Sequence, residues 1–118
     1  MLGAAHACAN PLTSGYGVAH GAAVLLLLPH VIRYNEPDAG RLYAELLAAD
    51  ESSGSGGLAE RVMWMRDLGG LPARLRDAGI PVEALARLAG EAAQQWTAEF
   101  NPRPVTERDL RTLYESAY

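Results

Sequence analysis

The chain is organised around the stretch His6-Ala-Cys-Ala-Asn10-Pro-Leu-Thr-Ser-Gly15-Tyr-Gly-Val-Ala-His20, which leads into the apolar run Ala22-Ala-Val-Leu-Leu-Leu-Leu28. Proline and glycine between the two histidines predict a helix end, a turn and a new helix start. Such a turn would bring the imidazoles of His6 and His20 together. Because the leucine run is apolar on every side, its helix is expected to be buried at the centre of the core.

Helical spacing of apolar residues continues beyond this stretch, and no alternation of apolar and polar residues lasts long enough for a strand. The first helix is predicted over residues 2–10, closed by Pro11. The second is predicted from His20 towards Tyr34, with a kink or a break at Pro29.

The next helix is predicted to begin at Pro37. Its face toward the core is expected to consist of Leu42, Leu46 and Ala49. A flexible surface loop is expected over residues 51–57, which are rich in serine and glycine. A further helix is predicted over 58–68, stopped by a pair of glycines. Its core face is expected to contain Leu58, Val62 and Met65, and its neighbours Met63 and Trp64 are expected to fill the core or an interface.

Two more helices are predicted near the C-terminus. Pro81 is a suitable first-turn residue for a helix whose apolar positions are Leu85, Leu88, Ala92 and Trp96. Thr106 is the predicted N-cap of the last helix, with Asp109 as the reciprocal partner of a capping box. The predicted fold class is therefore all-α, an array of five to seven helices forming one domain over residues 1–118.

Charge and composition exclude several classes of function. The net charge is −4 and no basic stripe is present, which argues against nucleic-acid binding. The longest apolar run has seven residues, whereas a membrane-spanning helix needs about 20, so we expect no membrane insertion. No signal peptide is recognisable, and Cys8 as the single cysteine favours a reducing compartment. We therefore expect a cytoplasmic protein.

His6 and His20 are the candidate metal ligands, because neutral imidazoles bind Zn²⁺ and Fe²⁺ well. A working site needs about three or four ligands, so two histidines are half a site. By itself a pair at this spacing is more often not a metal site. His30 is read as a packed histidine and Cys8 as a small core residue. Asn10 is left open between a pocket residue and a helix C-terminal cap.

Several separated motifs resemble the C-terminal helical region of the iron-containing (group III) alcohol dehydrogenases. They are His6-Ala-Cys-Ala-Asn10-Pro-Leu-Thr, Gly17-Val-Ala-His20-Gly, Leu28-Pro-His-Val, Tyr34-Asn35, Gly69-Gly-Leu-Pro, Gly79-Ile-Pro and Asn101-Pro-Arg-Pro-Val-Thr106. The resemblance extends over essentially all 118 residues in the family's order. It implies an all-α fold like the C-terminal domain of those enzymes.

In that family one Asp and three His hold a divalent metal, and the resemblance places His6 and His20 at the last two histidine positions. The other two ligands, and the domain that binds NAD or NADP, precede this region in the family. The N-terminal nucleotide-binding domain is therefore expected to be absent from these 118 residues. Many members have a histidine where this chain has Asn10, which leaves Asn10 with a weak role as a pocket residue for substrate or nicotinamide.

The resemblance implies a divalent-metal (Fe²⁺ or Zn²⁺), NAD(P)-dependent alcohol dehydrogenase that interconverts alcohols and aldehydes or ketones. The isolated chain is expected to be inactive and to bind metal weakly, and its partner would be the missing nucleotide-binding domain or chain. The alternatives are a non-catalytic helical interaction module or one half of a split enzyme. Without the nucleotide-binding domain, the surface that faces it in the family would be exposed, so homodimerisation through that surface is also expected. Substrate, cofactor choice and metal identity depend on residues outside this sequence.

Overall fold

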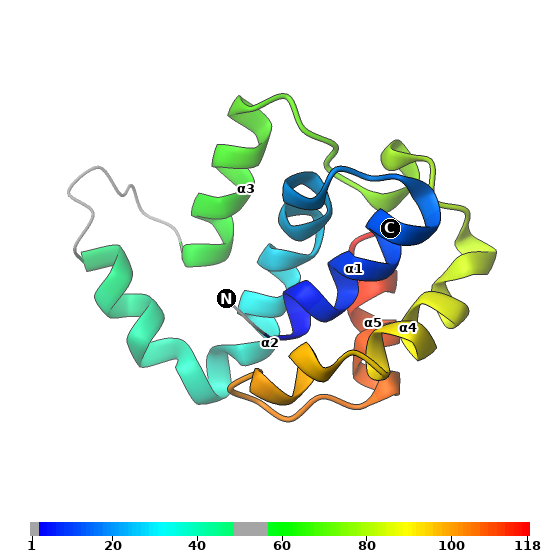
Figure 1. Cartoon of the computed structure of the whole chain (residues 1–118). Coiled ribbons are helices and arrows are strands. Elements are labelled where there is room, and N and C mark those ends of the chain that lie inside the picture. Colours follow the sequence, from blue (N-terminus) through cyan, green and yellow to red (C-terminus); the bar gives the residue numbers. More distant parts are fainter. Residues whose placement is uncertain (1–2, 49–56) are drawn as a thin grey trace.

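A computed structural model describes residues 3–48 and 57–118. Its α-helices are α1 (Ala4–Tyr16), α2 (His20–Ala48), α3 (Leu58–Leu68), α4 (Leu85–Ala93) and α5 (Glu107–Ser116). Three short 3₁₀ segments, η1 (Leu75–Ala78), η2 (Val82–Ala84) and η3 (Trp96–Phe100), connect them. No strand occurs among the described residues, so the all-α prediction is confirmed (Figure 1). The predicted loop over 51–57 lies outside them except for Gly57.

α1 is longer than predicted, because Pro11 lies inside the helix and does not close it. The missing N–H of an interior proline costs a helix roughly 3 kcal/mol. Burial of Pro11 and the neighbouring Leu12 against the rest of the core offsets this cost. The helix instead ends at Gly17, whose φ of 66° is left-handed and whose N–H bonds to the Thr13 carbonyl.

α2 is likewise one continuous helix with Pro29 and Pro37 inside it, so the predicted new helix at Pro37 is wrong. Figure 1 shows α2 changing direction along its length, as helices with interior prolines do. The core face predicted for its second half is also wrong, because Leu42 and Leu46 are 62% and 60% exposed. Ala49, the third residue of that face, lies outside the described residues.

The main core joins α1, the first half of α2, α4 and α5. Its fully buried side chains include Leu12, Leu26, Leu27, Leu88 and Tyr114. The predicted central position of the leucine run is therefore confirmed. The Tyr114 hydroxyl donates a 2.7 Å hydrogen bond to the Cys8 carbonyl, which ties the last helix to α1. Burial raises the pKa of Tyr114 above its usual range, so this donor stays protonated.

α3 packs on the middle of α2 through a second, smaller cluster of Ile32, Ala59 and Val62. The predicted span of this helix is confirmed, but its predicted core face is only partly buried. Trp64 and Met65 are about half exposed because the second half of α2 does not cover them. Among the described residues, no helix is long and apolar enough to cross a membrane.

The C-terminal predictions are confirmed in part. Pro81 precedes a helical segment, η2 followed by α4, with Leu85, Leu88 and Ala92 buried. Trp96 belongs instead to η3 and is 61% exposed, stacked edge-on against Phe100 at 5.8 Å between ring centroids.

The capping box that begins α5 is complete. The Thr106 hydroxyl accepts from the Asp109 N–H at 3.2 Å, and the Asp109 carboxylate accepts from the Thr106 N–H at 2.9 Å. This predicted helix start is therefore confirmed.

Candidate metal centre

The two helices that meet at the N-terminal side of the core bring His6 and His20 together. His6 lies in the first two turns of α1, and His20 is the first residue of α2. Their ring centroids are 5.2 Å apart and their planes are inclined by 51°. The predicted juxtaposition is confirmed, although it arises because α2 starts beside the beginning of α1 and not beside its end.

The environment favours the neutral form of His6. Burial lowers the pKa of His6, and the positive charge that His20 would carry lowers it further. His6 is partly buried, whereas His20 is exposed. Neutral imidazole is the form that binds a metal ion, so the donor set suits Zn²⁺ or Fe²⁺.

The remaining ligands are not found on this part of the chain. Across residues 3–48 and 57–118, no three His, Cys, Asp or Glu side chains are grouped so that they could hold a metal ion. Cys8 is fully buried, and burial raises the pKa of its thiol to about 12, so it is not a thiolate ligand. The expectation that Cys8 is a small core residue is confirmed. His6 and His20 are thus two candidate ligands, and no third is grouped with them among the described residues.

Asn10 lies inside α1, one turn after His6, so its interpretation as a helix C-terminal cap is wrong. Its side-chain amide Nδ2 donates a 3.1 Å hydrogen bond to Oε1 of Gln95, just before η3. The amide of Asn10 therefore holds the η3 segment against α1. A role for Asn10 toward substrate or nicotinamide stays a prediction.

His30 lies away from the pair, farther along α2. It lines a separate shallow pocket of about 450 Å³ with Arg33, Tyr34, Thr112 and Ser116. Burial and the nearby charge of Arg33 lower its pKa. This half-buried position agrees with its interpretation as a packed histidine.

An apolar pocket of about 350 Å³ opens beside His6. Its walls come from α1 and from one face of α2, including Val24, Leu28 and Val31, and its polar lining includes Asn35 and Asn101. Sequence reasoning missed both asparagines as parts of this site. Their only signal was membership in the motifs of the family resemblance.

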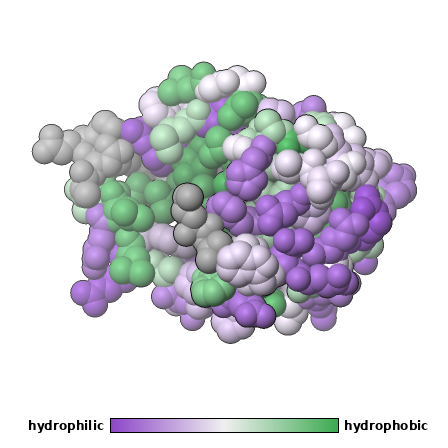
Figure 2. All heavy atoms as spheres, in the orientation of Figure 1, coloured by the Kyte–Doolittle hydropathy of each residue, from purple (hydrophilic) through white to green (hydrophobic). Residues whose placement is uncertain are grey.

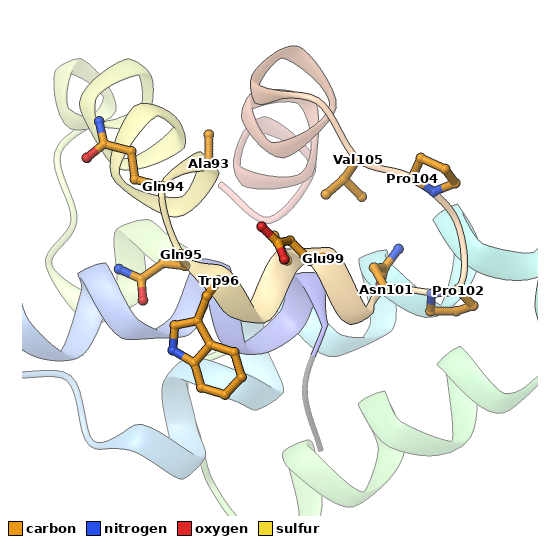
Figure 3. A pocket seen from close by; sticks show the side chains of 10 residues that line it. Ala93, Gln94, Gln95, Trp96, Glu99, Asn101, Pro102, Pro104 and Val105 are labelled. Atoms are coloured by element: carbon orange, nitrogen blue, oxygen red, sulfur yellow. The ribbon is translucent and has the colours of Figure 1, made fainter.

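A third pocket, of about 420 Å³, lies beside η3. Figure 3 shows Ala93, Gln94 and Gln95 on one side, Pro102, Pro104 and Val105 on the other, and Glu99 between them. Trp96 points away from this space. Asn101 lines both pockets, so the loop after η3 separates this space from the pocket beside His6.

The described residues form an all-α domain, with the two candidate ligands at the starts of its first two helices. The whole chain, residues 1–118, matches the Fe-containing alcohol dehydrogenase family, C-terminal, and the chain belongs to that family. It is 32% identical to the lactaldehyde reductase of Escherichia coli K12, over 99% of this chain and 33% of that protein. It is 30% identical to the 1,3-propanediol dehydrogenase of Klebsiella pneumoniae, over 99% of this chain and 32% of that protein.

The fold agrees with a solved relative. A crystal structure of a 1,3-propanediol oxidoreductase superposes with a TM-score of 0.87 at 28% identity, covering 98% of this chain and 32% of that one. The chain thus spans about a third of the length of the curated relatives it matches.

Proposed function

We propose that this chain is the C-terminal, metal-binding portion of an NAD(P)-dependent alcohol dehydrogenase that interconverts alcohols and aldehydes or ketones. The observation that carries the proposal is the contact of His6 and His20, 5.2 Å apart, within a chain that matches the Fe-containing family along its whole length. The relatives named as lactaldehyde reductase and 1,3-propanediol dehydrogenase support small alcohols and aldehydes as the substrate class.

His6 and His20 would hold a divalent metal, Fe²⁺ or Zn²⁺, together with an Asp and a His from a segment that these 118 residues do not include. When bound, such an ion supplies a Lewis acid that polarises the oxygen of an alcohol or carbonyl group. NAD or NADP would be bound by the family's nucleotide-binding domain, which is the partner we infer for this chain.

The chain's own residues prepare the site in two ways. Partial burial keeps His6 neutral, so its ring nitrogen is available as a ligand. One wall of the pocket beside His6 is apolar, formed by Val24, Leu28 and Val31. An apolar wall next to the ligand lowers the local polarity, which strengthens the electrostatic interactions formed there.

The proposal is tested with the purified chain and Zn²⁺ alone, following the ring signals of ¹³C-labelled histidines by NMR. The His6 and His20 signals are expected to shift together along one binding curve, while His30 stays unchanged. His6→Ala and His20→Ala should each weaken binding to the level of a single histidine. Independent curves for the two rings, or binding in H20A equal to that of the unaltered chain, would contradict the site.

The isolated chain should lack dehydrogenase activity, because half of the ligand set and the nucleotide site are supplied elsewhere. With NADH, Zn²⁺ or Fe²⁺ and short aldehydes, we expect no steady NADH oxidation. His6→Ala is the matched control, since activity that persists in it comes from a contaminating enzyme. Oxidation that is present in the unaltered chain and lost in H6A would show that the chain works alone.

A second candidate is a non-catalytic helical module that acts by packing against a partner or by self-association. The specific observation is the exposure of large apolar side chains on the second half of α2 and on α3, among them Leu42, Leu46 and Leu68. Figure 2 shows apolar residues gathered over this part of the surface. Sedimentation at several concentrations decides between the two, because a monomer that binds Zn²⁺ supports the first candidate alone.

A further inference from the structure

Two points of α1, its start and its middle, are tied to the segment around η3. Near the middle of the helix, Asn10 bonds to Gln95. At its start, the backbone N–H of Ala4 donates to Oδ1 of Asn101 at 3.3 Å. Ala4 lies two residues before His6, so the hydrogen bond to Asn101 holds the backbone close to the point where the His6 side chain is attached.

Asn101 uses every hydrogen-bonding position of its amide. Its Oδ1 accepts from Ala4 and from Nδ2 of Asn35, the latter at 3.1 Å. Its Nδ2 donates to Oδ1 of Asn35 at 2.7 Å and to the Arg103 carbonyl at 2.6 Å. Asn35 lies on α2 and is 3% exposed. Asn101 itself is partly buried. An amide pair bonded in both directions favours one geometry, because each displacement leaves a donor or acceptor unpaired.

The start of α1 has no side-chain cap of its own, so the Ala4 N–H depends on Asn101 Oδ1 as its acceptor. The N-cap residue is Gly3, whose side chain can offer no acceptor to the free N–H groups of the first turn. Gly3 has a φ of 133°, and a Cβ there would lie 3.4 Å from Asn101 Oδ1. Only glycine therefore lets the backbone adopt this angle beside the amide.

The loop that carries Asn101 is itself fastened to α2. Nη1 of Arg103 donates to the Tyr34 carbonyl at 2.8 Å, and its guanidinium lies 4.1 Å from the centroid of the Tyr34 ring. The loop is thus bonded to two consecutive residues of α2, Tyr34 and Asn35, and it is bonded to α1 through Ala4. Asn35 and Asn101 also line the pocket that His6 lines.

We propose that Asn101, paired with Asn35, is a positioning residue for His6: it caps α1 from outside the helix and sets where the helix begins against α2, and so fixes the spacing of His6 and His20. This inference rests on the proposed metal-binding function. Asn101 touches neither imidazole, so it acts through the backbone of α1 and not as a ligand.

The first test compares Asn101→Ala and Asn101→Asp in the metal-free chain. The measurement is the nuclear Overhauser effect between the ring protons of His6 and His20. N101A is expected to lose most of this effect, and the Ala4 amide should exchange faster with solvent. N101D keeps an oxygen acceptor for the Ala4 N–H at a helix start, where negative charge is favourable, but it loses the amide donor that bonds Asn35 and Arg103. It should therefore retain more of the effect than N101A and less than the unaltered chain.

The second test titrates the same variants with Zn²⁺. N101A should bind about fivefold more weakly, the change expected from one lost hydrogen bond, and the affinity of N101D should lie between those of N101A and the unaltered chain. Thr106→Ala is the matched control, because it removes a helix cap of similar strength from α5. T106A should lower stability by a similar amount and leave both the ring contact and Zn²⁺ binding unchanged.

If N101A does not fold, Gly3→Ala provides the same test, because it disturbs the start of α1 and leaves the amide pair in place. A ring contact and a Zn²⁺ affinity that are unchanged in N101A, or reduced equally in T106A, would overturn the positioning role. If the unaltered chain binds no Zn²⁺ through His6 and His20, the proposed function fails. The ring contact in the metal-free variants still decides the positioning role in that case.

Discussion

The two halves of α2 have similar apolar spacing and different surroundings. In the first half, Leu26 and Leu27 are fully buried between α1, α4 and α5. In the second half, which extends away from α4 and α5, Leu42 and Leu46 stay more than half exposed (Figure 1). Apolar residues at helical spacing therefore predict a helix in both halves. Whether that helix has a buried face depends on how many neighbours reach it.

The same difference in packing separates the candidate site from an outlying region, which consists of the second half of α2 together with α3. The half of α2 that packs into the core begins with His20 and contacts α1, which carries His6. Rigid packing there holds two side chains in one geometry, as a metal site requires. The outlying half and α3 have a small core of their own, Ile32, Ala59 and Val62. We therefore expect this part of the chain to open at a lower free energy.

The largest expected difference comes from truncating one leucine in each half. Leu27→Ala should lower the free energy of unfolding by about 2–5 kcal/mol, because it leaves a cavity in a filled core. Leu46→Ala, the matched control, should change it by less than about 0.5 kcal/mol. Chemical denaturation measures both. Equal losses would show that the outlying half is packed in solution.

Val62→Ala tests the smaller cluster that joins α2 to α3. We expect a loss of about 1–2 kcal/mol from the two buried methyl groups. Hydrogen exchange should show the loss mainly as faster opening of α3, with the amides of α1 and α5 little affected. Uniform acceleration across the chain would mean that both regions unfold as one unit.

Thr106→Ala removes the cap of α5, which belongs to the well-packed region. The expected cost is about 1 kcal/mol, measured by thermal or chemical unfolding. The cap also makes stability depend on pH. Hydrogen bonds from Thr106 lower the pKa of Asp109 in the folded chain, so this contribution is complete above the unfolded value near 4. It is lost as pH falls below that value towards the folded pKa, and Asp109→Ala should reduce the loss.

Thr97→Val addresses a buried hydroxyl of the well-packed region. Among the described residues, the Thr97 Oγ1 is buried with no hydrogen-bond partner. Replacing it with a methyl group of similar shape should be neutral or stabilise the fold by up to about 1 kcal/mol. A clear destabilisation would reveal a partner for this hydroxyl, such as an ordered water.

The smallest effect is expected at the surface of the outlying region. The Arg33–Glu60 ion pair joins α2 to α3 at 2.7 Å, but both side chains are about half exposed. Glu60→Gln should therefore cost less than about 0.5 kcal/mol, and salt should reduce even that difference. A larger effect in low-salt denaturation would show that this pair, and not the small apolar cluster, holds α3.

The sequence predicted the helical class, the span of α3 and the capping box of α5 because each depends on neighbouring residues. It also identified His6 and His20, since the motifs around them match a family pattern. The errors occur where contacts between distant residues decide how far a helix continues. Pro11 is expected to end a helix, but it is buried inside α1. Pro37 is expected to begin one, but α2 runs through it without a break.

By itself the sequence determined that the chain is helical, where α3 and α5 begin, and which pair of side chains has the chemistry of a metal ligand. These properties are local, because helix propensity, capping and imidazole basicity are set within a few residues. Only the tertiary structure decided that the two imidazoles lie 5.2 Å apart and that Leu42 and Leu46 face outward. It also decided that Asn35 and Asn101, from segments far apart in the chain, share one hydrogen-bonded pair. Such long-range contacts depend on the packing of the whole core, which no local pattern encodes.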